Sequence, residues 1–147
     1  MKPIVYVAVI SVLVSGCSII GSGNSEHALD ATDSQCKLQV ENAGSFWNGH
    51  QIHGTWNAPN LDRLPNGISE FLRMEGYSIQ HSENDNVAHG IFHSNGKPYH
   101  MIASLKHHPE MHIQLEFITP RLIGLRLSDV QKEFCRLLNH SGVTQEG

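Results

Sequence analysis

Two segments of alternating apolar and polar residues, joined by Asn95-Gly96, constrain the fold of this chain most strongly. Asn-Gly is the dipeptide that best suits a two-residue type I′ turn, and alternation with a period of two is typical of a half-buried strand. Residues 87–93 and 98–106 therefore predict a β-hairpin. Centring the turn on the dipeptide predicts three cross-strand pairs on the apolar face: Phe92 with Tyr99, Gly90 with Met101, and Ala88 with Ala103.

A third strand is predicted at 111–118, after a turn around Pro109 and before Pro120. A slip of one residue would turn its apolar side chains to the polar face, so matching the faces fixes the register. In that register the apolar face continues across the sheet. The predicted neighbours are Ile113, Leu115 and Phe117 beside Leu105, Ala103 and Met101.

Two helices are predicted, one on each side of this three-strand unit in the sequence. Residues 68–75 carry apolar side chains at helical spacing, and Gly76 suits the position just after a helix. A second helix is predicted to open at Ser128, where Gln131 completes a capping-box pattern. Its predicted buried stripe consists of Val130, Phe134, Leu137 and Leu138.

Shorter strand signals complete the fold prediction. Residues 36–40 and 77–81 alternate in polarity, and Asn48-Gly49 indicates a short pairing within 45–56. Together these elements predict an α+β fold, in which a meandering antiparallel sheet of about four to five strands has helices packed on one face.

The N-terminus carries an apolar run, 4–14, after Lys2. This run is too short to span a hydrocarbon core about 30 Å thick, but it matches the apolar region of a secretory signal peptide. The sequence that follows, Val14-Ser15-Gly16-Cys17, resembles the lipobox of bacterial lipoproteins. The resemblance implies diacylglyceryl transfer to the Cys17 thiol, cleavage before Cys17, and acylation of the new amine by a chain such as palmitate.

The same resemblance predicts the compartment and the division of the chain. Ser18 occupies the place where inner-membrane lipoproteins of Gram-negative bacteria carry Asp, which implies an outer membrane lipid anchor at the periplasmic face in such a host, and a cell membrane lipid anchor otherwise. We expect a signal peptide at 1–16, a lipidated flexible tether at 17–34 that is rich in Gly, Ser, Asn and Asp, and a single globular domain at 35–147. A net charge of −4 argues against a nucleic-acid partner.

Two cysteines remain once Cys17 is lipidated. Cys36 and Cys135 lie near opposite ends of the predicted domain, in a compartment that is oxidising. They predict one disulfide, for which only one connectivity exists. Such a bridge would contribute about 4–5 kcal/mol in the chain-entropy model, and it would leave no thiol free to act as a nucleophile.

Histidine is unusually frequent, with 11 residues against 10 lysines and arginines together. The polar face of the predicted sheet gathers five candidate metal ligands: His89, His93, His100, His112 and Glu116. Imidazoles with a carboxylate bind Zn²⁺ or Cu²⁺, so a metal-binding lipoprotein is one alternative function. A polar face covered by solvent or by a partner is the other interpretation, since no compact metal motif occurs. The histidines also suggest pH sensing, because imidazole titrates between pH 5 and 8.

Two tryptophans form the second candidate site. Trp47 stands in an aromatic, Asn- and Gly-containing segment, and Trp56 follows nine residues later. Exposed tryptophans stack on glycans or on partner loops, whereas a buried pair would belong to the core. The sequence therefore leaves both a contact site and a core pair open.

Enzyme motifs are missing from the sequence: it has no Gly-x-Ser-x-Gly elbow and no phosphate-binding loop. We therefore predict a non-enzymatic module that is held at the membrane by the acyl chains on Cys17 and binds a protein partner in the envelope, as an assembly factor or as an inhibitor of the immunity type. No cofactor is expected in this function. Alternatives are the metal-binding lipoprotein, a lipoprotein that binds peptidoglycan through Trp47 and Trp56, and a His/Glu hydrolase.

Overall fold

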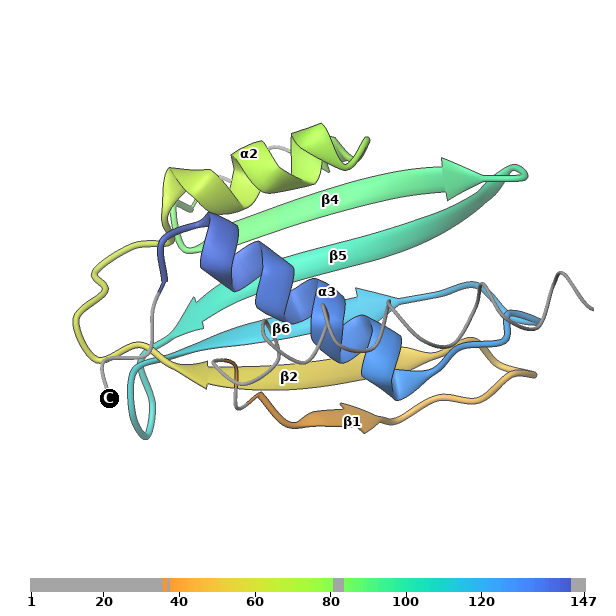
Figure 1. The fold of residues 1–147 in the computed structure, drawn as a ribbon, viewed down its shortest axis with the longest axis horizontal. Coiled ribbons are helices and arrows are strands. Elements are labelled where there is room, and N and C mark those ends of the chain that lie inside the picture. The colour runs from red at the N-terminus through yellow and green to blue at the C-terminus, as the bar shows by residue number, and fades with distance from the viewer. Residues whose placement is uncertain (1–35, 37, 81–83, 144–147) are drawn as a thin grey trace, which may run out of the picture. The chain divides into compact units, whose positions relative to one another are not determined.

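The computed structural model describes residue 36 and residues 38–80 and 84–143 (Figure 1). The predicted signal peptide 1–16, the tether 17–34 and the lipid attachment site Cys17 lie outside the described residues. In the part of the chain that is described, no helix combines the length and the hydropathy that a membrane span needs.

Within the described residues, six strands form one antiparallel sheet and are accompanied by two helices. The elements are β1 (Val40–Asn42), β2 (Gln51–Asn57), α2 (Asn66–Met74), β3 (Ser78–Gln80), β4 (Val87–Ser94), β5 (Lys97–Lys106), β6 (His112–Ile118) and α3 (Leu127–His140). The spatial order of the strands is β1-β2-β6-β5-β4-β3, and every neighbouring pair is antiparallel. The predicted α+β class is confirmed.

Both helices lie on the same face of this sheet (Figure 1). Helix α2 packs beside β3 and β4, and α3 crosses the sheet diagonally toward β1 and β2. Their apolar stripes and the apolar face of the strands form one core, since burying such stripes is what stabilises a helix on a sheet. The most deeply buried side chains include Leu38, Ile52, Ile68, Leu72, Met101, Ile113, Leu115, Phe134, Leu137 and Leu138.

The central hairpin has the predicted register. Phe92 pairs with Tyr99, Gly90 with Met101, and Ala88 with Ala103. Asn95 and Gly96 have φ values of 52° and 72°, as a type I′ turn requires. Strand β6 also takes its predicted place, with Ile113, Leu115 and Phe117 opposite Leu105, Ala103 and Met101.

The predicted number of strands, four to five, is wrong, because the sheet has six. The two outermost strands, β1 and β3, are only three residues long. Both overlap segments that the sequence predicts as strands, 36–40 and 77–81. The strand that was placed only loosely is β2, because the pairing expected within 45–56 had no firm register.

The first predicted strand, 36–40, starts too early. Cys36 and Leu38 are buried, but pairing with β2 begins only at Val40. The carbonyl of Leu38 instead accepts a hydrogen bond from Gln131 Nε2 in α3, at 2.6 Å. Cys36 is bonded to Cys135 of the same helix, as predicted, across a sequence separation of 99 residues.

The helix boundaries show one success and one failure of local signals. Gly76 follows α2 with φ at +87°, as a residue after a helix end requires. The capping box predicted at Ser128 is wrong, because α3 begins at Leu127 with Arg126 as its N-cap and no side-chain capping bond. The side chain of Gln131 donates instead to the carbonyl oxygen of Leu38, so a tertiary hydrogen bond replaces the local capping bond.

The Asn48-Gly49 segment joins β1 to β2, but not as the two-residue turn expected. Ser45 and Gly49 pair across an intervening stretch of three residues, 46–48. Gly49 has φ at +91°, and a Cβ there would lie 2.5 Å from the carbonyl oxygen of Thr119. Glycine is therefore needed at 49 for the close approach of another loop rather than for a tight hairpin turn.

Candidate functional site

The polar sheet face brings together only part of the predicted histidine group. His89 Nε2 and His100 Nδ1 are 2.9 Å apart, and their rings stack with centroids at 5.2 Å. Glu116 lies on the same face, paired with Ile102 and His53, and its carboxylate accepts a hydrogen bond from Gln51. His53 was not predicted here, because its strand was placed only loosely by the sequence.

The remaining two predicted ligands lie apart from this pair. His93 is exposed beside the β4–β5 turn, opposite Pro98. His112 stands at the start of β6, opposite Lys106, and its Nδ1 is 2.8 Å from the carbonyl oxygen of Glu110. Over residues 36, 38–80 and 84–143, no three His, Cys, Asp or Glu side chains are grouped so as to hold a metal ion.

The surroundings of His89 favour its neutral ring. Burial lowers the pKa of His89, the neighbouring His100 lowers it further, and the Glu116 carboxylate acts in the opposite direction. A hydrogen bond between two imidazole nitrogens needs one donor and one acceptor, which two protonated rings cannot supply. The contact between the two rings is therefore incompatible with protonation of both.

The two tryptophans have different environments. Trp56 is 3% exposed and belongs to the core, on the same strand face as Ile52, so it is not available to stack on a ligand at the surface. Trp47 is 74% exposed. The two tryptophans therefore form neither a core pair nor a joint contact site: Trp56 is wrong as a contact residue, and only Trp47 remains at the surface.

Trp47 is part of a small apolar cluster, which we call the aromatic tip and define as Phe46, Trp47 and Leu122. Phe46 is 43% exposed and meets Trp47 edge to face, with ring centroids 5.3 Å apart. Leu122 is 49% exposed, and its N–H donates to the carbonyl oxygen of Phe46 at 2.6 Å. Three large apolar side chains are thus displayed together by two loops, 43–50 and 119–123.

His50 fixes these two loops to each other. Its N–H donates to Thr119 Oγ1 at 3.1 Å, and its carbonyl oxygen accepts from the Thr119 N–H at 2.9 Å. Its ring joins Asn42 through Nδ1 at 2.9 Å and the carbonyl oxygen of Ile123 through Nε2 at 3.0 Å. The aromatic tip therefore rests on a closed set of hydrogen bonds, which the sequence did not reveal because its partners are about 70 positions apart.

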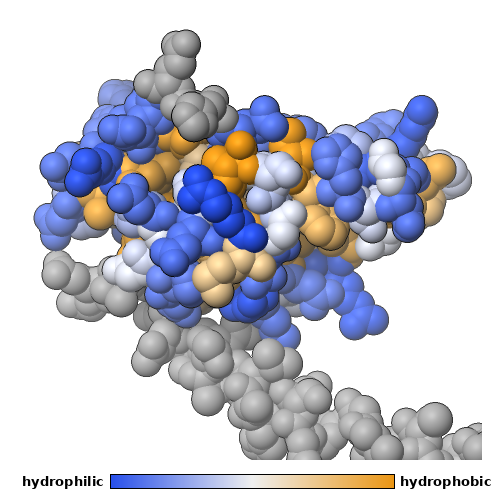
Figure 2. Space-filling view, turned by 90° about the horizontal axis from the view of Figure 1, so that it is seen from above, coloured by the Kyte–Doolittle hydropathy of each residue, from blue (hydrophilic) through white to orange (hydrophobic). Residues whose placement is uncertain are grey.

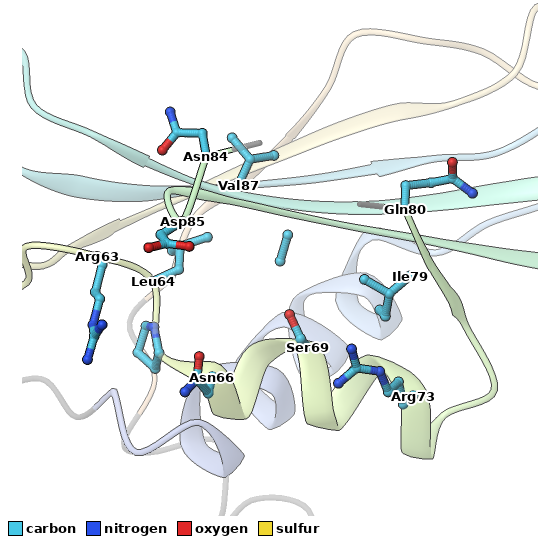
Figure 3. Close-up of a pocket in the computed structure, with 12 residues that line it drawn as sticks. Arg63, Leu64, Asn66, Ser69, Arg73, Ile79, Gln80, Asn84, Asp85 and Val87 are labelled. Atoms are coloured by element: carbon cyan, nitrogen blue, oxygen red, sulfur yellow. The ribbon is translucent and has the colours of Figure 1, made fainter. Parts of the chain in front are cut away.

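A polar hollow of about 220 Å³ lies between α2 and the β3–β4 edge (Figure 3). Arg63 and Arg73 reach its two ends, with Asn66 and Ser69 of α2 between them and Asp85 nearby. The carboxylate offsets part of the positive charge of the two guanidinium groups. This hollow was not predicted, because its residues come from four separate segments with no motif among them.

Comparison of the chain with protein-family models, with curated proteins and with solved structures finds no match in any of the three. The function has to be inferred from the sequence and from the geometry just described.

Proposed function

We propose that this chain is a lipid-anchored, non-enzymatic protein of the bacterial envelope that binds a protein partner through the aromatic tip. The observation that carries the binding proposal is the joint exposure of Phe46, Trp47 and Leu122 on loops fixed by His50. Aromatic side chains, Trp above all, dominate the energetics of protein interfaces. Side chains held in place before binding lose less entropy on association.

The anchor in this proposal comes from the lipobox at Cys17. Eighteen residues, 18–35, separate Cys17 from Cys36, which as a flexible chain gives a mean reach of roughly 20–25 Å. Acyl chains on Cys17 would then hold the domain near the periplasmic face of the outer membrane in a Gram-negative host. Envelope assembly and inhibition of an incoming toxin or hydrolase both fit such a position.

A protein partner fits the tip better than peptidoglycan does. Glycan recognition commonly combines several stacking platforms, and burial of Trp56 removes the second tryptophan that the glycan alternative required. The tip instead combines an aromatic pair with an aliphatic side chain, and aromatic side chains are enriched in protein contact surfaces.

The test uses the full-length chain, in its native envelope, with a photocrosslinker at Asn48 beside Trp47. We expect a defined crosslinked species that is lost in Trp47→Ala and Leu122→Ala. Met74→Ala is the matched control, since Met74 is 67% exposed on α2, outside the tip. It should retain the crosslink at equal protein abundance. An unchanged crosslink in Trp47→Ala, or equal loss in Met74→Ala, would refute the proposal.

A further inference from the structure

The helices leave part of the apolar sheet face uncovered. Figure 1 shows the β4–β5 hairpin extending beyond both α2 and α3. A groove of about 270 Å³ opens there. Its walls come from the end of α2, from β4 to β6 and from the start of α3, and the lining residues are Glu75, Tyr77, Phe92, Met101, Phe117, Leu125, Asp129, Val130 and Glu133. The space-filling view from above shows hydrophobic residues at the surface between hydrophilic ones (Figure 2).

Aromatic rings line the groove and continue along the hairpin. Tyr77 and Phe92 have ring centroids 5.8 Å apart, Phe92 and Tyr99 6.5 Å, and Tyr99 and Phe117 6.4 Å. Gly90 makes room for this row, because a Cβ there would lie 2.9 Å from Tyr77 Cβ. Aromatic rings of this kind can contact an apolar or a guanidinium group.

The rim of the groove is acidic. Three carboxylates line it, from Glu75, Asp129 and Glu133. Arg136 pairs with Glu75 at 2.9 Å and with Glu133 at 2.7 Å, so one cation serves two of the three carboxylates. Asp129 has no ion pair within the described part of the chain.

The negative field reaches the groove wall. The pKa of Tyr77 is raised to about 12, first by burial and then by the charges of Glu133 and Glu75. The same field favours a cation beside these carboxylates and disfavours an anion, such as a phosphate or a lipid headgroup.

We propose that this acidic groove binds a cationic amphipathic peptide segment of a partner protein, with an apolar side chain over Met101 and an arginine or lysine beside Asp129. The volume of this groove lies just below the range of about 300–1,000 Å³ that small-molecule and cofactor sites occupy. The groove therefore suits one or two side chains of a partner. Arginine suits it best, because a guanidinium stacks on aromatic rings and pairs with a carboxylate. This second contact surface does not depend on the aromatic tip.

The test measures binding of two fluorescein-labelled peptides by anisotropy: acetyl-Arg-Leu-Arg-Phe-amide and the same peptide with Glu in place of Arg. The full chain is held in phosphatidylcholine nanodiscs, and empty nanodiscs are the blank. We expect the arginine peptide to bind at least about tenfold more tightly than the glutamate peptide, and raised salt to weaken it.

Variants locate the site. Asp129→Asn and Glu133→Gln should each weaken binding of the arginine peptide about two- to fivefold. Glu70→Gln is the matched control, because Glu70 is exposed on α2 and does not line the groove; it should leave the affinity unchanged. Equal affinity for both peptides, equal loss in Glu70→Gln, or self-association of the chain through the groove would overturn the proposal. The crosslink from position 48 should be unaffected by these variants, so failure of the groove proposal can be distinguished from failure of the proposed function.

Discussion

His50 is held in a single tautomer by its surroundings. The Ile123 carbonyl can only accept, so Nε2 carries the proton. Asn42 Oδ1 accepts from the Gly44 N–H at 2.9 Å, which turns the Asn42 amide nitrogen toward His50 Nδ1. Two donors would meet if Nδ1 were protonated. The hydrogen bonds beneath the aromatic tip therefore fit the tautomer that carries its proton on Nε2.

His89 gives the pH prediction. Because its native pKa is lowered, the unfolded chain takes up the proton first as the pH falls. Its contribution to stability is complete above the unfolded pKa of about 6.5, is lost as the pH falls toward the lowered native value, and is constant below it. His89→Gln should flatten that part of the curve.

The measurement is the free energy of unfolding in urea between pH 5 and 8 for both proteins. His107→Gln is the control, since His107 is exposed in the turn between β5 and β6; it should keep the wild-type slope. The other groups that face His89, namely His100 and Glu116, are common to all three proteins. A His89→Gln curve parallel to wild type would show that the histidine pair does not titrate with folding.

Elements differ in how far their own sequence determines them. The register of the β4–β5 hairpin was predicted to the residue, because a type I′ turn and a two-residue period act locally and agree. Strands were predicted at 36–40 and 77–81, but β1 begins only at Val40. The start of α3 was also misplaced, because Gln131 bonds to Leu38 across the fold and does not cap its own helix. Long-range contacts decide such boundaries, and local propensity does not record them.

The candidate site shows the same division. Trp47 was identified because a Trp beside Asn and Gly indicates an exposed loop. Leu122 and His50 were missed, because their contacts join loops about 70 positions apart. Burial of Trp56 follows from its place two and four residues after Gly54 and Ile52 on one strand face, and it was left open only because β2 had no firm register.

The disulfide fixes one element to another, tying the residues before β1 to the middle of α3. Cys36→Ala combined with Cys135→Ala should lower the free energy of unfolding by about 2–5 kcal/mol, because the open chain gains entropy when the long loop is no longer closed. Urea titrations with and without dithiothreitol measure this. The reductant should shift wild type and leave the double variant unchanged; an equal response from both would show that the bridge carries no stability.

At the scale of the whole molecule, the proposed anchor predicts that Cys17→Ser yields an unacylated protein. Cells supplied with labelled palmitate should label the wild-type chain and not the variant, since the thiol is the acceptor of the lipid. The wild type should sediment with membranes, because two or more acyl chains hold a protein stably on a bilayer. Cys36→Ser is the control and should still be labelled. Label retained on Cys17→Ser would contradict the anchor.

The three-residue strands at the two edges of the sheet bear on whether copies of the protein aggregate when they are concentrated on a surface. A long unpaired strand offers its backbone as a template, on which further copies add and polymerise. Tethering to a bilayer confines molecules to two dimensions, where collisions between neighbours become frequent. Edge strands as short as β1 and β3 offer a neighbouring molecule little backbone to pair with, so the proposed anchor would let the protein reach a high density on a membrane without forming fibres.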